Sequence, residues 1–293
     1  MNLKKGTAML QRSPHPWLIV VACATLSVAG CGGPEPEASV STTASATPSA
    51  SASALPVPSA SPGGTGAESH LCDAISLTLD AGIATGYSCT EYPETTEDFL
   101  LPERAVILLE GYAGPNDRRF GSITLFPVAN FVAVDPYVET HLTDLKALLG
   151  GGAPPTSQTT FGKGLPMIEP RDAGQVYFAQ YALRPMQSGI GIRYLAQYAQ
   201  EQVLVSSDSM SYTFQGLTDD GKYWVSAILP VGHQDFSEVL LDPPGGGTWE
   251  EFWARYDDYL EGAVEQLDRE LPAGFEPSLE DLDALVASIT VAP

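Results

Sequence analysis

The sequence predicts an α+β fold, in which an antiparallel β-sheet of about six to eight strands is covered by two or three amphipathic helices. Two observations lead to this class. Between residues 175 and 229, segments rich in Tyr, Val, Ile and Phe follow one another at hairpin spacing. Before and after them, apolar residues recur at helical spacing in the segments 138–149, 249–267 and 279–289.

The expected strands fall into two groups. In the first, Ile75, Leu77 and Leu79 alternate with polar or small residues, which is typical of a strand, and 83–87 forms either its return strand or a short helix. A long-looped hairpin follows, with strands at 105–109 and 122–128. The second group is a meander whose last turn contains an Asp-Gly hairpin signal; its strands are expected at 175–183, 191–199, 211–217 and 222–229.

Capping residues mark the expected helix boundaries. Asp135 and Pro136 open the helix 138–149, and a run of glycines ends it. Thr248 and Glu251 have the spacing of a capping box at the start of the helix 249–267. Ser278 is the expected cap of the last helix.

The N-terminus has the pattern of a secretory signal peptide. Basic residues precede an apolar run from Trp17 to Leu26, which is shorter than the about 20 residues that a membrane span needs. Small residues then lead to Cys31. The segment Leu26–Cys31 resembles the cleavage site of bacterial lipoproteins, in which the cysteine receives a diacylglycerol and becomes the mature N-terminus.

Three parts of the chain are therefore expected. Residues 1–30 form a lipoprotein signal peptide, and residues 31–69 form a disordered tether rich in Ser, Ala, Pro and Thr. Residues 70–293 form a single globular domain. The lipoprotein resemblance implies a location on the cell membrane or outer membrane, at its extracytoplasmic face, with acyl chains on Cys31 as the anchor.

The chain is strongly acidic. Its net charge is −22, and removal of residues 1–30, which hold three basic and no acidic residues, takes the net charge to −25. Nucleic acids and anionic lipid surfaces attract positively charged proteins, so nucleic acid is excluded as a partner. The expected partners are the membrane, through the lipid anchor, and an unidentified envelope protein or small ligand.

Cys72 and Cys89 are the cysteines that lie beyond the predicted lipidation site. They are 17 positions apart, and outside the cytoplasm such a pair usually forms a disulfide bond. The bond is expected to staple the start of the globular domain to its first hairpin.

The sequence shows no catalytic or metal-binding motif. The histidines beyond residue 31 lack the close spacing of a zinc site, and there is no Gly-x-Ser-x-Gly elbow. His233 precedes Gln234 and Asp235 and is interpreted as a loop residue rather than a catalytic base. Asp219 and Asp220 supply too few carboxylates for a calcium loop. We therefore predict no catalytic residue, no metal site and no cofactor.

One group of polar residues on the predicted strands is a candidate ligand site. If the strands are neighbours, Gln180, Arg193, Gln197 and Gln215 form a polar patch beside aromatic side chains. Amide and guanidinium groups next to aromatic rings suit sugars or peptides. The alternative interpretation is the solvated face of a half-exposed sheet.

The runs 191–200 and 212–227, the second of which contains Gln-Gly-Leu-Thr-Asp-Asp-Gly, resemble an uncharacterised group of bacterial lipoproteins. The resemblance covers about residues 100–290 and implies a location and a fold but no activity. The order of strands, helix, meander and helix is also similar to the Mog1/PsbP-like sandwich. The expected function is that of a non-enzymatic binding or interaction module. The alternatives are an extracytoplasmic hydrolase with a site assembled from distant residues and a passive surface component.

Overall fold

The computed structural model describes residues 70–293, except 97–98, 116–119, 160–163 and 237–241. The predicted signal peptide, the tether and Cys31 lie outside these residues. The described residues belong to a compact unit that spans residues 64–293. None of the helices described is both long enough and apolar enough to cross a membrane.

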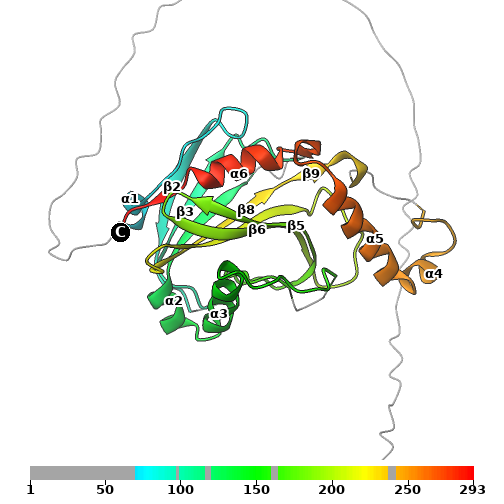
Figure 1. Cartoon of the computed structure of the whole chain (residues 1–293), viewed down its shortest axis with the longest axis horizontal. Coiled ribbons are helices and arrows are strands. Elements are labelled where there is room, and N and C mark those ends of the chain that lie inside the picture. Colours follow the sequence, from blue (N-terminus) through cyan, green and yellow to red (C-terminus); the bar gives the residue numbers. More distant parts are fainter. Residues whose placement is uncertain (1–69, 97–98, 116–119, 160–163, 237–241) are drawn as a thin grey trace, which may run out of the picture. The chain divides into compact units, whose positions relative to one another are not determined.

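An open seven-stranded antiparallel sheet confirms the predicted fold class (Figure 1). The strand order is β2-β3-β4-β8-β7-β6-β5, so β2 and β5 are the two edge strands. The meander β5 to β8 occupies one side of the sheet, as the sequence predicted. The strands are β2 (Gly86–Tyr92), β3 (Arg104–Glu110), β4 (Ser122–Pro127), β5 (Gly174–Met186), β6 (Gly189–Ala199), β7 (Ser211–Thr218) and β8 (Tyr223–Pro230).

Helices cover both faces of the sheet (Figure 1). On one face, α5 (Tyr256–Arg269) and α6 (Leu279–Ala287) pack with Leu195, Tyr212 and Phe214 in what we name the α5/α6 core. On the other face, α2 (Val128–Val134) and α3 (Val138–Leu149) pack with Tyr194 and Trp224 in the α3 core. The amphipathic periodicity of 138–149 and 256–267 therefore buries its apolar stripe against the sheet, as predicted.

Short elements complete the chain outside the main sheet. The strand β1 (Ile75–Ser76) pairs with β11 (Thr290–Val291), and β9 (Gly232–His233) pairs with β10 (Phe275–Glu276). The remaining elements are α1 (Leu71–Ala74), α4 (Trp249–Trp253) and two 3₁₀ helices, η1 (Gln234–Phe236) and η2 (Pro272–Gly274).

Several predicted boundaries were wrong. The strand expected from residue 75 to 79 stops at Ser76, because its partner β11 offers two residues to pair with. The next strand is β2, which begins at Gly86 rather than at residue 83. The run 122–128 ends as a strand at Pro127, and a helix that the sequence analysis missed follows at once. The helix 249–267 is interrupted at Arg255, whose backbone dihedrals (φ −117°, ψ 22°) are not helical.

Cys72 and Cys89 lie at disulfide-bonding distance, with 2.05 Å between their sulfur atoms. The bond joins α1 to β2 and confirms the predicted pairing. A second contact supports the same junction, because the Cys72 backbone N–H donates a hydrogen bond of 2.8 Å to Glu91 Oε1 on β2.

Candidate functional site

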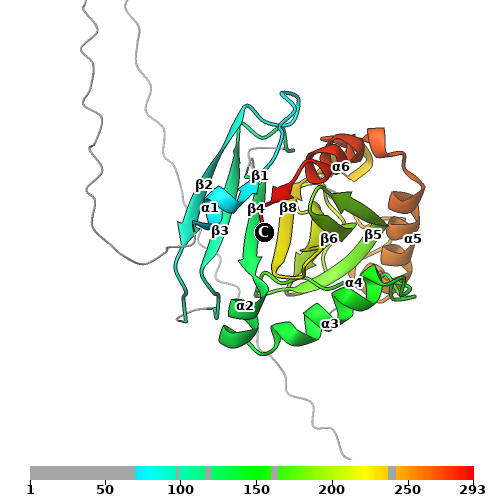
Figure 2. The same cartoon turned by 60° about the vertical axis from the view of Figure 1, so that its left-hand side comes forward.

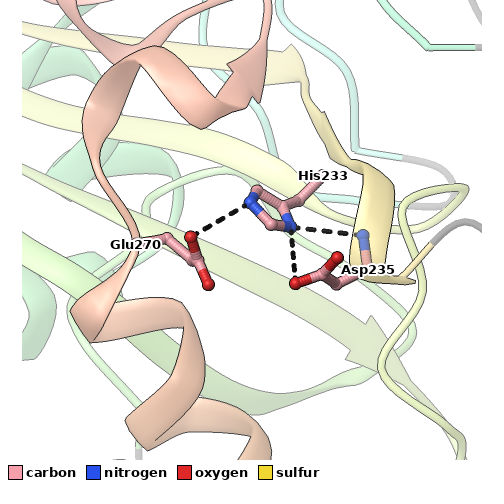
Figure 3. A group of neighbouring side chains, drawn as sticks. All are labelled: His233, Asp235 and Glu270. Atoms are coloured by element: carbon pink, nitrogen blue, oxygen red, sulfur yellow. Dashed lines mark hydrogen bonds and ion pairs between the residues drawn. The ribbon is translucent and has the colours of Figure 1, made fainter.

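A buried histidine lies between two carboxylates at the end of α5 (Figure 3). His233 comes from β9, Asp235 from η1, and Glu270 is the residue that ends α5. His233 Nε2 lies 3.4 Å from Glu270 Oε2, and His233 Nδ1 lies 4.0 Å from Asp235 Oδ2. The His233 side chain is 3% exposed, whereas the carboxylates are partly open to solvent. One imidazole thus meets a carboxylate at each of its nitrogens.

The backbone of His233 is fixed from both sides. Ser207 Oγ accepts a hydrogen bond of 2.9 Å from the His233 N–H and donates one of 2.7 Å to the His233 carbonyl. In the β9–β10 ladder His233 is paired with Phe275, whose ring centroid lies 5.0 Å from that of the imidazole. Gly274 leaves room beside the ring, since a Cβ there would lie 3.2 Å from Nε2. These contacts fix the backbone of His233 and pack its imidazole against Phe275.

The two carboxylates are positioned by α5. Gln266 Nε2 donates a hydrogen bond of 3.0 Å to Asp235 Oδ2. The Asp235 backbone N–H lies 3.3 Å from His233 Nδ1 and donates to it. One turn along α5 from Gln266, Glu270 reaches the other imidazole nitrogen. A single helix end therefore sets the distance between the two carboxylates.

Gln180 on β5 anchors this helix end. Its side-chain Nε2 donates hydrogen bonds of 2.8 Å to the Leu267 carbonyl and 2.9 Å to the Glu270 carbonyl at the C-terminus of α5. Its backbone N–H donates to Asp268 Oδ1. In the described part of the chain, Gln180 is the one non-glycine residue with a positive φ, 54°. This conformation costs about 1–2 kcal/mol and is maintained here by the contacts with α5.

The histidine also lines a surface pocket of about 610 Å³. Gly274 belongs to the same pocket, whereas Asp235 and Glu270 are not among its lining residues. The other lining residues are mostly small or polar: Gly114, Pro115, Ser207, Gly232, Gln234, Ala273, Phe275 and Glu276.

The donor atoms of this cluster are of the kind that can hold a cation. His233, Asp235 and Glu270 offer one nitrogen and two carboxylate oxygens, and these atoms all lie within 4.8 Å of one another. Ser207 lines the same pocket, but its hydroxyl is engaged with the His233 backbone instead of the imidazole. A serine nucleophile must instead bond to the nitrogen of its base.

This cluster was not predicted from the sequence, for a physical reason. His233 and Asp235 are two positions apart and were noted, but Glu270 is separated from them by α4 and α5. The contact depends on how α5 docks against β5, which no local spacing reveals. The sequence feature that could have indicated the site is His233 with Asp235 two positions later, because the chain has only four histidines.

The four residues of the predicted polar patch do not converge. Gln180 and Arg193 do meet, because the Arg193 guanidinium donates to the Gln180 carbonyl. Gln197 lies four positions along β6 from Arg193, about 13 Å away, and its side chain braces the loop at Leu204 and Ser206 instead. Gln215 is on the opposite face of the sheet.

The register of β6 and β7 explains the error. Arg193 is paired with Phe214, so these two side chains share a face and Gln215 points to the other one. There Gln215 accepts hydrogen bonds from Ile168 N–H and Trp224 Nε1. The alternative interpretation, a solvated sheet face, is also wrong, because Arg193, Gln197 and Gln215 are at most 3% exposed.

Arg193, which is buried, belongs to an ion-pair network under α6 whose other members, Arg184 and Asp283, are partly exposed. Asp283 accepts hydrogen bonds from Arg184 Nε at 2.6 Å, from Arg193 Nε at 3.2 Å and from the Tyr212 hydroxyl at 2.9 Å. Burial, and then the adjacent Asp283 carboxylate, raise the pKa of Tyr212, so its hydroxyl remains a neutral donor. The network joins α6 to β5, β6 and β7.

A second partly buried carboxyl, that of Glu169, lies near Thr124 on β4 and Ser226 on β8. Burial raises the pKa of Glu169, while the hydroxyls of Thr124 and Ser226 and the charge of Arg171 oppose the shift. Glu169 Oε1 is a buried atom without a hydrogen-bond partner. Ser226 also accepts a hydrogen bond of 2.7 Å from Gln215 Nε2, and Gln215 in turn accepts one from the Ile168 N–H. Glu169 is therefore linked to Gln215 through Ser226.

In the turn at Asp219 and Asp220, the Asp220 carboxylate binds groups of the turn itself. Asp220 Oδ1 accepts hydrogen bonds from the Lys222 N–H at 3.0 Å and the Thr218 hydroxyl at 2.7 Å. The Lys222 contacts, first of all, lower the pKa of Asp220 to about 2. This pattern is that of a hairpin turn, as the sequence analysis interpreted it.

Neither a protein-family model, nor a curated protein, nor a solved structure matches this chain. The resemblances to a group of bacterial lipoproteins and to the Mog1/PsbP-like element order therefore stay predictions.

Proposed function

We propose that this protein is a lipid-anchored binding protein of the extracytoplasmic envelope, and that its folded part binds a divalent transition-metal cation such as Zn²⁺ through His233, Asp235 and Glu270. The proposed location is supported by the lipoprotein-like segment that ends at Cys31. The proposed ligand is supported by the geometry of the three side chains.

The observation that carries the proposal is the 3.4 Å distance between His233 Nε2 and Glu270 Oε2. Charge-assisted N–H···O hydrogen bonds usually measure about 2.7–2.9 Å, so the pair is too far apart for a strong one. Two ligands at about 2.0–2.1 Å from a tetrahedral Zn²⁺ lie about 3.3 Å apart. The pair already has the separation that a shared ion requires.

The donor set selects the class of cation. An imidazole nitrogen with two carboxylates suits Zn²⁺ and its neighbours among the transition metals, whereas Ca²⁺ and Mg²⁺ prefer oxygen ligands throughout. The two carboxylates also supply the negative charge that a divalent cation requires. An ion bound to Nε2 requires the imidazole proton on Nδ1, so the Asp235 N–H contact to Nδ1 at 3.3 Å has to be given up on binding. Asp235 then either accepts a hydrogen bond from Nδ1–H as an outer-shell carboxylate or turns toward the ion as a third ligand. In both cases His233 and Glu270 are direct ligands.

The binding function is favoured over the hydrolase alternative by the contacts of Ser207. Its hydroxyl is bonded to the His233 backbone on both its donor and its acceptor side. The imidazole nitrogens face carboxylates instead.

Isothermal titration of Zn²⁺ into the untagged protein in detergent tests the metal site. We expect one ion per chain, and an affinity at least about tenfold lower for His233→Gln and Glu270→Gln. The matched control is Glu265→Gln, which removes one carboxylate from the exposed face of the same helix and should leave the affinity unchanged. Equal affinities in all variants, or no binding to the wild type, would overturn the proposal.

Intact mass spectrometry of the membrane fraction tests the anchor separately. We expect a mass excess of acyl-chain size on the wild-type chain that is absent from Cys31→Ala. An uncleaved chain without this excess would contradict the lipid anchor and leave the metal site untouched.

A further inference from the structure

The two edges of the seven-stranded sheet are treated differently. At the β5 edge, the Phe178 N–H donates to the Gln158 carbonyl and the Gln187 N–H donates to the Ile289 carbonyl, so neighbouring segments use the outer backbone groups. At the other edge, β2 pairs with β3 on its inner side, and no described strand pairs with its outer side (Figure 2).

The backbone hydrogen bonds of β3 show which groups of β2 point outward. The Leu109 N–H donates a 3.0 Å hydrogen bond to the Gly121 carbonyl, so the backbone groups of Leu109 face β4. Tyr87 is paired with Leu109 across the β2–β3 ladder, and such a pair exchanges no hydrogen bond within that ladder. The N–H and carbonyl of Tyr87 therefore point away from the sheet. By strand alternation the same holds for Cys89 and Glu91.

This edge has few of the features that usually protect one, and Glu91 is the one charged residue of β2. Natural sheets protect their edges with proline, lysine, bulges or a covering element. The sequence of β2 contains neither proline nor lysine, and its ladder with β3 is regular over seven pairs. Tyr87 and Tyr92 are each 40% exposed. The bond between Cys72 and Cys89 holds the strand in place while leaving its outer backbone groups unpaired with any described strand.

The charges around the edge indicate the kind of partner. Glu110 is paired with the first residue of β2, and Glu94 and Glu103 follow near its other end. Glu91 lies on β2 itself, where its carboxylate also accepts the Cys72 N–H and lies 3.9 Å from His70 Nδ1. Arg104, which lies over the Tyr92 ring at 5.2 Å, is the cation among the described residues of this hairpin. A net negative edge in a chain of net charge −22 favours a basic partner and disfavours a second copy of itself.

We propose that β2 is a docking edge to which a partner protein adds an extended segment, as an eighth strand, with basic side chains that face the glutamates. Main-chain hydrogen bonds to Tyr87, Cys89 and Glu91 supply the affinity, and the flanking carboxylates select a basic sequence. This inference is independent of the metal site, which lies at the end of α5.

Fluorescence anisotropy with a defined probe tests the docking edge. The probe is a labelled seven-residue peptide of alternating lysine and valine, and its control replaces each lysine with glutamate. We expect the lysine peptide to bind the untagged protein in detergent and the glutamate peptide not to bind. Tyr87→Pro removes the outward N–H and should weaken binding at least about fivefold. Tyr87→Ala removes the ring, retains that N–H and should bind more tightly than Tyr87→Pro.

Two results would overturn the proposal. The first is absence of lysine-peptide binding, or equal binding to Tyr87→Pro and Tyr87→Ala. The second is a wild-type dimer in analytical ultracentrifugation that Tyr87→Pro dissociates, because the occupant would then be a second copy of the chain. Circular dichroism and an unchanged Zn²⁺ affinity in the proline variant would show that it is folded, so a failure here is separable from a failure of the metal site.

Discussion

The two edge strands of the sheet, β5 and β2, differ in how their outer sides are covered. At β5 the chain departs from regular pairing at Gln180, and the side chain of this residue binds the end of α5. At β2 the pairing stays regular, and a bond to α1 holds the strand. The covered edge is the one that assembles distant side chains into a candidate site. The uncovered edge keeps backbone groups available for a partner.

The two edges also depend on different interactions for stability. Near β5, Asp283 compensates two arginines, of which Arg193 is 2% exposed. Near β2, the cross-link acts mainly on the unfolded chain by restricting its conformations. Disrupting each edge should therefore give effects that differ in size and in location.

The largest expected effect is at the covered edge. Asp283→Ala leaves the buried Arg193 without its counter-charge, so we expect the free energy of unfolding to fall by about 3–5 kcal/mol. Urea unfolding measures the loss. The control is Glu265→Ala, whose exposed ion pair with Arg269 at 3.8 Å should change stability by about 0–1 kcal/mol. Equally small losses in both variants would show that the Asp283 network does not stabilise this edge.

The next effect concerns the uncovered edge. Replacing Cys72 and Cys89 with serine opens a loop of 17 residues and should cost about 3 kcal/mol. Hydrogen exchange should accelerate at the amides of β2 more than at those of β5. Uniform acceleration over the whole sheet would contradict a local role for the bond.

A smaller effect tests the direction of the β2 backbone groups. Ser88 alternates with Tyr87, so its N–H faces β3, and Ser88→Pro should cost about 1–3 kcal/mol through the lost ladder bond. Tyr87→Pro should cost about 1 kcal/mol or less, because its N–H makes no ladder bond. Thermal unfolding of both variants measures the difference. The reverse order would place the N–H of Tyr87 inside the ladder.

The smallest expected effect on stability concerns Glu169. Its carboxyl interacts with Thr124 on β4 and Ser226 on β8, so it belongs to neither edge strand. Burial raises the pKa of Glu169, so the folded state holds this proton more tightly than the unfolded chain does. Its contribution to stability is present below the ordinary carboxyl range and is lost as the pH rises through the raised pKa. Compared with Glu169→Gln, the wild type should lose stability as the pH rises above the ordinary carboxyl range. Parallel urea-unfolding profiles of the two proteins would contradict the shift.

The parts of the fold that the sequence predicted are those with local periodicity. The meander after residue 174 and the helix 138–149 have strong patterns of period 2 and 3.6, and both exist within a few residues of the expected bounds. The short helix α2 was missed because the apolar run that ends β4 continues into it without a break in composition. The interruption at Arg255 was missed because apolar spacing continues across it.

The candidate site could not be predicted from the sequence for a different reason. The predicted patch assumed that polar residues of neighbouring strands share a face, but the pairing of Arg193 with Phe214 places Gln215 on the other face. Gln180 was correctly singled out as a polar residue on its strand, yet its role depends on a bulge that turns it toward α5. Glu270 had no signal of its own, because its partner His233 is reached only after α5 docks on the sheet.

The most direct test of the account is anomalous diffraction from crystals of the untagged protein grown with Zn²⁺. The account predicts a peak at the zinc edge between His233 Nε2 and Glu270 Oε2, at about 2.0–2.2 Å from each. The 3.4 Å gap between these atoms already matches that position. Peaks confined to other carboxylates, with the gap between His233 and Glu270 empty, would contradict the proposed function.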